Sequence, residues 1–314
     1  MKILGISALY HDSAACLVED GRILAAVQEE RFSRIKNDAS FPINAIMFCL
    51  KSTGTELSQL DAIAFYDKPY LKFERLLETY YHHAPLGLVQ FLKGIPVWSQ
   101  EKLFFKKLLT RELGRLSAPG QKSLPPLFFP EHHLSHAAST FFASPFKEAG
   151  ILTIDGVGEW STASLGMGQG NKISISRELG FPHSLGLFYS AFTYFLGFKV
   201  NSGEYKLMGL APYGNKGSEQ FSELYQKARG LIDIKGDGSI ALNMPFFNFT
   251  KGLTMIRAKK WESLFGFRKR QPDGGIKQHH CDLALAAQEI TTETMVKMAR
   301  ENKRLHVSEN LCMA

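Results

Sequence analysis

The sequence predicts an α/β fold built from two similar lobes. Residues 3–9 are apolar and are followed by a polar loop, a second apolar stretch, a tight turn at residues 19–22 and a third stretch, which is the pattern of three short strands. The same order of strand, Asp-containing loop, strand, turn and strand returns over residues 150–178. A strand order that returns in this way indicates a duplicated architecture.

Two lobes that each open with a three-strand meander are typical of actin-like (ASKHA) proteins, in which paired loops face a nucleotide. We expect a first lobe over residues 1–149, with a helical insert over about 68–130, and a second lobe over residues 150–314. Apolar spacing predicts the remaining elements. These are helices over 44–53, 71–81, 186–198 and 282–302, a strand over 62–67, a hairpin within 234–250 and a further edge strand in the last ten residues.

The composition is that of a globular protein that stays in the cytoplasm. Of 314 residues, 45% are hydrophobic and 21% are charged. The four cysteines are scattered without CxxC spacing, which argues against a disulfide or thiolate framework. The first residues lack the features of a signal peptide, and no stretch of 18 apolar residues occurs, so we expect neither export nor membrane insertion.

The net charge of +7 is concentrated in two basic segments, residues 102–115 and 257–270. Such segments attract nucleic acid or a phosphorylated small molecule, or they are solvated helix faces. The chain contains no RRM, KH or helix-turn-helix pattern, so we do not expect nucleic acid as its partner.

His132 and His136 are four residues apart in a segment that is predicted to be helical. Pro130 favours a helix start at residue 131 or 132, and positions i and i+4 share one helix face. Asp155 ends the first strand of the second repeat. Two imidazoles and one carboxylate suit Fe(II), Mn(II) or Zn(II) and leave positions open for substrate. The alternatives are a structural histidine pair and a turn-forming aspartate.

Three further groups of residues are candidates for binding or proton transfer. Gly156 and Gly158 allow close backbone approach to a phosphate, although the spacing is not that of a P-loop. Gly203 offers the same freedom, and Glu204 is a candidate acid, base or orienting residue. The other candidates are Lys206 as a point charge for phosphate, and His11 and Asp12 in the matching loop of the first repeat. Each of these side chains could instead be an ordinary surface or turn residue.

Four long segments carry a family resemblance. They are ILGISALYHDSAACLVEDGRILAAVQEERFSRIKND, HHLSHAASTFFASPF, ILTIDGVGEWSTASLG and GEYKLMGLAPYG. Together, and in this order, they resemble the NodU/CmcH carbamoyltransferases, which O-carbamoylate nodulation factors, cephalosporin precursors, aminoglycosides and related hydroxyl compounds. The resemblance extends over essentially the whole chain.

The resemblance implies a Kae1-like N-terminal part of actin-like fold and a YrdC-like C-terminal lobe. The YrdC-like lobe makes carbamoyladenylate from carbamoyl phosphate and ATP, and the Kae1-like part passes the carbamoyl group to a hydroxyl-bearing small molecule. It also implies a metal, usually iron, at His132, His136 and Asp155, with manganese, zinc or magnesium as alternatives. Lys206, Gly203 and the backbone of residues 155–159, including Gly156, Gly158 and Glu159, would face the nucleotide phosphate. Asp12 or His11 would take the proton of the acceptor hydroxyl.

Family members continue beyond the position of residue 314. We therefore expect that the second actin-like lobe is incomplete and that a further carboxylate ligand and the YrdC-like lobe are missing from this chain. The chain would be a fragment, a truncated reading frame or one piece of a split enzyme, and in the last case the YrdC-like lobe is supplied in trans. Two other functions stay open. One is an actin-like phosphotransferase, and the other is a non-catalytic or split-enzyme fragment that binds a metal or a nucleotide.

Overall fold

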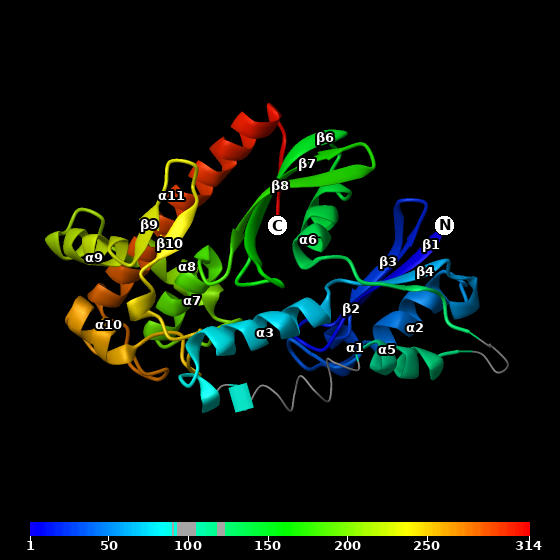
Figure 1. Ribbon diagram of the computed structural model, residues 1–314, viewed down its shortest axis with the longest axis horizontal. Coiled ribbons are helices and arrows are strands. Elements are labelled where there is room, and N and C mark those ends of the chain that lie inside the picture. Colours follow the sequence, from blue (N-terminus) through cyan, green and yellow to red (C-terminus); the bar gives the residue numbers. More distant parts are fainter. Residues whose placement is uncertain (90, 93–104, 118–122) are drawn as a thin grey trace. The chain divides into compact units, whose positions relative to one another are not determined.

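The computed structural model describes residues 1–89, 91–92, 105–117 and 123–314 (Figure 1). The chain divides into two compact units, Met1–Phe73 with Ile95–Ser135, and Glu74–Gly94 with His136–Ala314. The unit changes inside two continuous helices, α3 and α6, which span Pro69–His83 and His132–Phe141. The lobe boundary at residue 149 stays a prediction.

The first unit contains a mixed sheet in the order β3-β2-β1-β4-β5. Strands β1, β2 and β3 are antiparallel, and β4 and β5 are parallel to β1. The predicted tight turn joins β2 to β3. Asp20 and Gly21 both have a positive φ, as a type I′ hairpin turn requires. The strands are β1 (Lys2–Ser7), β2 (Ala14–Glu19), β3 (Arg22–Gln28), β4 (Ala62–Phe65) and β5 (Leu127–Phe128).

The second unit repeats this order in its own sheet, β8-β7-β6-β11. Strands β6, β7 and β8 are antiparallel, and β11 is parallel to β6 at the edge. These strands are β6 (Glu148–Ile154), β7 (Ser161–Gln169), β8 (Lys172–Gly180) and β11 (Leu311–Met313). The fold is therefore α/β, and its two mixed sheets open with the duplicated strand order that the actin-like prediction requires.

Helices bury one face against each sheet or against one another. In the first unit, α2 packs on β2 and β3 through Ala45, Ile46 and Cys49. The helices of this unit besides α2 are short or belong to the predicted insert, of which residues 90, 93–104 and 118–122 lie outside the described residues. Together with α2 (Ile43–Ser52), the described helices here are α1 (Glu30–Ser33), η1 (Leu57–Gln59) and α5 (Phe105–Gly114).

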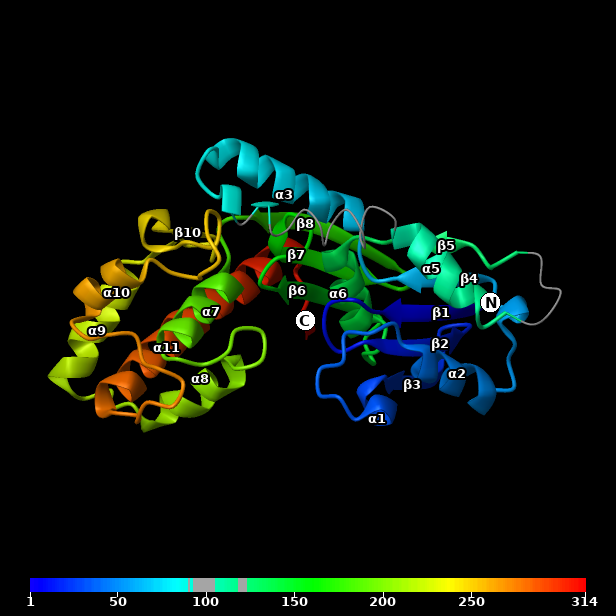
Figure 2. The ribbon, with the colours of Figure 1, turned by 90° about the horizontal axis from the view of Figure 1, so that it is seen from below.

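The largest apolar core belongs to the second unit. Its centre is aromatic, because Phe192 and Phe195 on one helix contact Trp261 on another, with ring centroids 4.9 and 5.3 Å apart. Figure 2 shows α7 and α11, which pack against each other in this core. The elements around it are α7 (Leu185–Phe195), α8 (Glu204–Leu210), η3 (Ala211–Tyr213), α9 (Glu219–Arg229), β9 (Ile232–Ile234), β10 (Ile240–Leu242), η4 (Met244–Phe246), α10 (Ala258–Phe265) and α11 (Gln278–His306).

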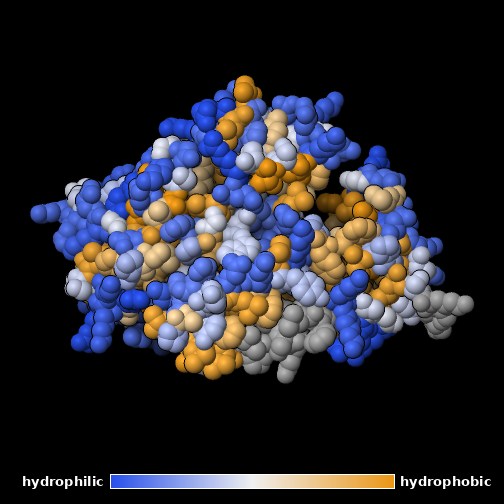
Figure 3. Space-filling model, in the orientation of Figure 1, coloured by the Kyte–Doolittle hydropathy of each residue, from blue (hydrophilic) through white to orange (hydrophobic). Residues whose placement is uncertain are grey.

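The surface shows where the basic segments lie. On α10, Trp261 and Phe265 are buried while Lys259 and Lys260 are exposed, so the basic residues of this helix lie on a solvated face. Arg270, at the end of the same basic segment, is buried. In the other segment, residues 102–104 lie outside the described residues. Figure 3 shows hydrophobic residues scattered among hydrophilic ones. Leu86 and Val89, which follow α3 in sequence, are exposed. Among the described residues, no helix has the length and apolar character needed to cross a membrane.

Candidate functional site

Helix α6 presents both histidines because its opposite face is anchored on the second sheet. Ala137 and Phe141 are buried against residues of β6 and β11. A Cβ atom on Gly168 of β7 would lie 2.5 Å from Cγ of Phe141, so the ring lies directly over the glycine. With this face of α6 fixed, the i, i+4 spacing places His132 and His136 on the other face, as predicted.

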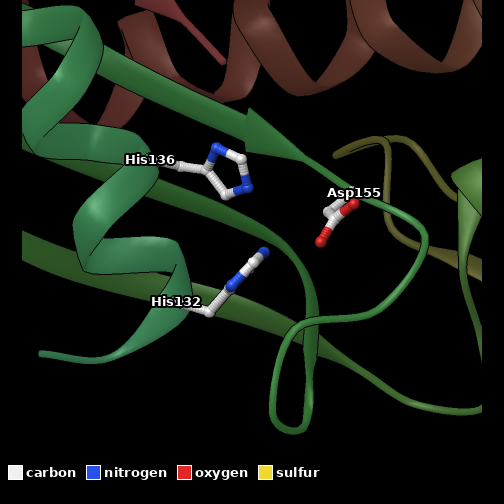
Figure 4. A group of neighbouring side chains, drawn as sticks. All are labelled: His132, His136 and Asp155. Carbon is white, nitrogen blue, oxygen red and sulfur yellow. The ribbon is translucent and has the colours of Figure 1, made fainter. Parts of the chain in front are cut away.

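The structure brings His132, His136 and Asp155 together. One ligand atom from each lies within 4.8 Å of the others, and all three side chains are partly buried. Figure 4 shows the two imidazoles leaving α6 toward the carboxylate that follows β6. The donor set of two imidazole nitrogens and one carboxylate oxygen fits Fe(II), Mn(II) or Zn(II). In the described part of the chain, this is the one group of three or more His, Cys, Asp or Glu side chains with metal-ligand spacing.

The backbone of Asp155 is tightly held. Its N–H donates to the carbonyl of Thr162 at 2.9 Å, and the N–H of Gly156 donates to Asp155 Oδ1 at 2.6 Å. The Ser184 hydroxyl donates to the carbonyls of Gly156 and Asp155, at 2.6 and 3.2 Å. The carboxylate is therefore attached to a fixed segment and is not on a free loop tip.

The loop after Asp155, over residues 156–160, is held from α3. Arg75 donates through one guanidinium nitrogen to the carbonyls of Gly158 and Glu159, at 2.6 Å each, and its guanidinium lies over the Phe181 ring at 5.4 Å. The N–H of Gly158 donates to the Ser161 carbonyl, so Gly156 and Gly158 both use their N–H groups within the loop. Glu159 is buried. Phosphate binding by this loop stays a prediction.

The matching loop of the first unit contains an Asp–His pair. His11 Nδ1 lies 2.8 Å from Asp12 Oδ2, and Asn37 donates to Asp12 Oδ1 at 2.9 Å. The hydrogen bond from Asn37, together with that to His11, holds the pKa of Asp12 below its ordinary value. Asp12 itself has a positive φ of 51°. The structure thus joins the two predicted residues and adds a third, Asn37.

The predicted residues around α8 take different positions. Glu204 accepts hydrogen bonds from the Ser190 hydroxyl at 2.8 Å and from the N–H groups of Asn201 and Gly203, each at 3.1 Å. Gly203 has no room for a side chain, because a Cβ would lie 2.5 Å from the Lys199 carbonyl oxygen. Lys206 is exposed and makes no ion pair within the described residues. Gly203 therefore allows the backbone of Lys199 to approach its own backbone closely, and Glu204 fixes the turn before Lys206.

Arg75, Ser184 and Asn37 were not predicted as site residues. Arg75 contacts a loop 83 and 84 residues away in sequence, and Ser184 a segment 28 and 29 residues away. The one local signal was a serine before an apolar helix, which predicts an N-cap but not a loop contact.

The protein-family model described as carbamoyltransferase N-terminus matches residues 2–314 of this chain. The protein sll1178 of Synechocystis sp., which is uncharacterized, is 53% identical over 312 residues, which cover 99% of this chain and 50% of that protein. The nodulation protein NolNO of Sinorhizobium fredii is 34% identical over 307 residues, which cover 97% of this chain and 40% of that protein. The chain thus spans about half the length of these relatives or less.

Similarity to solved structures is much weaker. YeaZ from Pseudomonas aeruginosa is 14% identical, with a TM-score of 0.30 over 58% of this chain and 66% of that chain, which is too low to place individual residues. The family match and the NolNO relative do not depend on it, and each covers nearly the whole chain. The chain belongs to the carbamoyltransferase family, in the part that forms the N-terminus of its members.

Proposed function

We propose that this chain carries the transfer site of an O-carbamoyltransferase. The carbamoyl group would come from carbamoyl phosphate through carbamoyladenylate, made with ATP, and would pass to a hydroxyl of a small molecule. The observation that carries the proposal is the cluster of His132, His136 and Asp155 in a member of the carbamoyltransferase family. The YrdC-like lobe that would make the carbamoyladenylate is a proposed partner of this chain.

The three clustered side chains would hold one divalent cation, Fe(II) in the first place. When bound, the cation would supply Lewis-acid stabilisation for anionic oxygens of the substrate. The chain's contribution is the donor set and its orientation, because α6 is anchored on the sheet and Asp155 on a fixed backbone. Manganese, zinc and magnesium remain the alternative ions.

His11 is the better candidate for the proton acceptor of the proposed pair. Because the pKa of Asp12 is lowered, its carboxylate is a weak base. The carboxylate accepts a hydrogen bond from the Nδ1–H of His11, which leaves Nε2 of His11 as the basic atom. In the proposed step, the acceptor oxygen bonds to the carbamoyl carbon, its proton passes to His11, and the bond from that carbon to the phosphate oxygen breaks. AMP leaves with the electron pair.

Lys206 would stabilise the departing AMP phosphate. Its exposed ammonium has no ion-pair partner in the described residues, so its charge is available to an anion. Glu204 would orient the turn before it, since its carboxylate is occupied by three donors from Ser190, Asn201 and Gly203. In this proposal Gly156, Gly158, Gly203 and Glu159 shape the loops around the phosphate.

The test combines metal analysis with product analysis. The chain is assayed with carbamoyl phosphate, ATP and hydroxyl acceptors, with and without the C-terminal lobe of a longer relative. We expect a carbamate ester that depends on that lobe, and loss of bound metal in the double variant His132→Ala/His136→Ala. The control is His82→Ala/His83→Ala, a histidine pair at the end of α3 in which His82 is exposed and His83 is partly buried. A phosphate ester as product would instead identify a phosphotransferase, and metal content unchanged in the first variant would refute the site.

A further inference from the structure

The N-terminus of α7 lies directly against the backbone of the proposed metal ligand. Ser184 is the N-cap of α7, fully buried, and its hydroxyl accepts the N–H of Leu187 at 2.9 Å. The same hydroxyl donates to the carbonyls of Gly156 and Asp155. One side chain therefore completes the helix start and holds the segment that carries the Asp155 carboxylate.

Gly186, in the first turn of α7, makes this approach possible. A Cβ atom there would lie 2.5 Å from the carbonyl oxygen of Asp155 and 2.7 Å from the backbone nitrogen of Gly156. Backbone atoms cannot yield as a flexible side chain does. Any larger residue would therefore push α7 away from the backbone of Asp155.

Helix α7 is itself immobilised by the core. Leu185, Phe188 and Phe192 are almost completely buried in the largest apolar cluster of the chain. Thr162 adds a second connection, because its carbonyl accepts the N–H of Asp155 while its hydroxyl donates to the carbonyl of His183 at 2.6 Å. The segment before α7 and the segment around Asp155 are thus bound to the same strand, β7.

We propose that Ser184 and Gly186 are positioning residues that orient Asp155 for metal binding. The inference rests on the proposed metal site and extends it to residues with no ligand atom at the metal. Partners that orient a metal ligand typically change metal affinity about 10- to 100-fold when they are removed. If they are positioning residues, their substitution must weaken metal affinity more than the loss of a helix cap elsewhere in the chain does.

The chain offers a matched control for the cap. Ser218 is the N-cap of α9, its hydroxyl accepts the N–H of Phe221 at 3.0 Å, and it donates to the carbonyl of Asn215 at 2.8 Å. It has the same two hydrogen-bonding roles as Ser184, on a helix that carries no proposed ligand. Ser184→Ala and Ser218→Ala therefore each remove a capping acceptor and a hydroxyl donor, at a buried serine and at a partly exposed one.

The experiment measures the Kd of the full chain for Mn(II) by titration, beside the Tm of each variant. We expect Ser184→Ala to weaken Mn(II) binding about tenfold, and Ser218→Ala to change it less than twofold, while both variants lower the Tm. Ser184→Thr keeps the hydroxyl and should restore binding. Ser184→Gly is a milder variant for the case that Ser184→Ala does not fold, because glycine is tolerated at N-caps.

A second pair tests the close approach. Gly186→Ala should weaken Mn(II) binding, whereas Gly114→Ala, at the end of α5 with open space around the added Cβ, should not. Equal Kd values for Ser184→Ala and Ser218→Ala would overturn the positioning role while the metal site stands. If the wild-type chain binds no Mn(II), or if His132→Ala/His136→Ala binds it as tightly as wild type, the proposed metal site fails and the inference falls with it.

Discussion

The loop between β1 and β2 and the loop between β6 and β7 occupy the same place in the two repeats, yet they hold their aspartates differently. Asp12 is hydrogen-bonded to His11 and Asn37, both within 25 residues, and it stays partly exposed. Asp155 is fixed through its backbone by Thr162 and Ser184. In the first loop the side chain is paired and available to solvent, whereas in the second the backbone is fixed and the carboxylate faces two histidines.

This difference shows how one strand order can serve two chemistries. A carboxylate paired with an imidazole suits proton transfer, because the pair can change protonation without a change of backbone. A carboxylate on a rigid backbone suits cation binding, because ligand geometry must be held. The comparison therefore predicts that substitutions in the two loops have separable effects.

The largest expected effect is on metal binding by Asp155→Asn. This change removes the negative oxygen while it keeps the shape, so the affinity for Mn(II) should fall by more than the roughly 100-fold that outer partners cost. Asp12→Asn should leave the affinity unchanged. Titration of both variants with Mn(II) measures this, and an equal loss in the two variants would mean that the loops do not differ as described.

The second effect concerns the rate of carbamoyl transfer. His11→Gln should lower the rate roughly 100-fold, the lower end for loss of a general base, without a change in metal content. His82→Gln, on an exposed residue of α3, is the control. The assay contains carbamoyl phosphate, ATP, a hydroxyl acceptor and the C-terminal lobe. A normal rate in His11→Gln would show that His11 is not the proton acceptor.

A smaller effect is expected where α3 holds the second loop. Arg75→Ala removes charged hydrogen bonds to two carbonyls and should lower the free energy of unfolding by about 2 kcal/mol, with faster amide exchange over residues 158–160. Arg268→Ala, on an exposed arginine of the basic segment, should change it by less than about 0.5 kcal/mol. Denaturant unfolding and hydrogen exchange measure both, and unchanged exchange in Arg75→Ala would show that the loop is rigid without it.

The smallest effect is on acid stability through the first loop. Because the folded-state pKa of Asp12 is lowered, its ionised form adds stability that is present above the unfolded-state pKa, near about pH 4. That stability is lost as the pH falls through the lower, folded-state pKa. Asn37→Ala removes the largest cause of the lowering, so the pKa of Asp12 should rise toward its ordinary value. An NMR titration of the Asp12 carboxyl measures this, and an unchanged pKa would assign the lowering to His11 instead.

Sequence patterns predicted the parts of the site that local spacing determines. The i, i+4 histidines, the strand-ending Asp155 and the repeated meander all follow from periodicities of a few residues. Helix α9 was not predicted, and α10 was foreseen only as one of the interpretations of the basic segment 257–270. The i, i+4 spacing of Trp261 and Phe265 predicts an amphipathic helix there, although basic residues are more numerous in this segment.

The supporting contacts could not be predicted because tertiary packing creates them. Nothing near Arg75 in sequence indicates that its guanidinium meets the carbonyls of Gly158 and Glu159. Glu204 was considered as an acid, a base or an orienting residue, and its spacing could not distinguish these. Its three hydrogen-bond donors lie within 14 residues, but only the folded turn brings them to one carboxylate.

The contact between Gly168 and Phe141 affects how related sequences should be compared. Since the ring occupies the space of a Cβ at position 168, a bulkier residue there requires a smaller one at 141 if α6 is to stay at the same height above β7. The pair is thus a volume constraint that alignments can score. A relative that keeps both histidines but carries large side chains at both positions would have the ligand motif without the helix placement that brings it to Asp155.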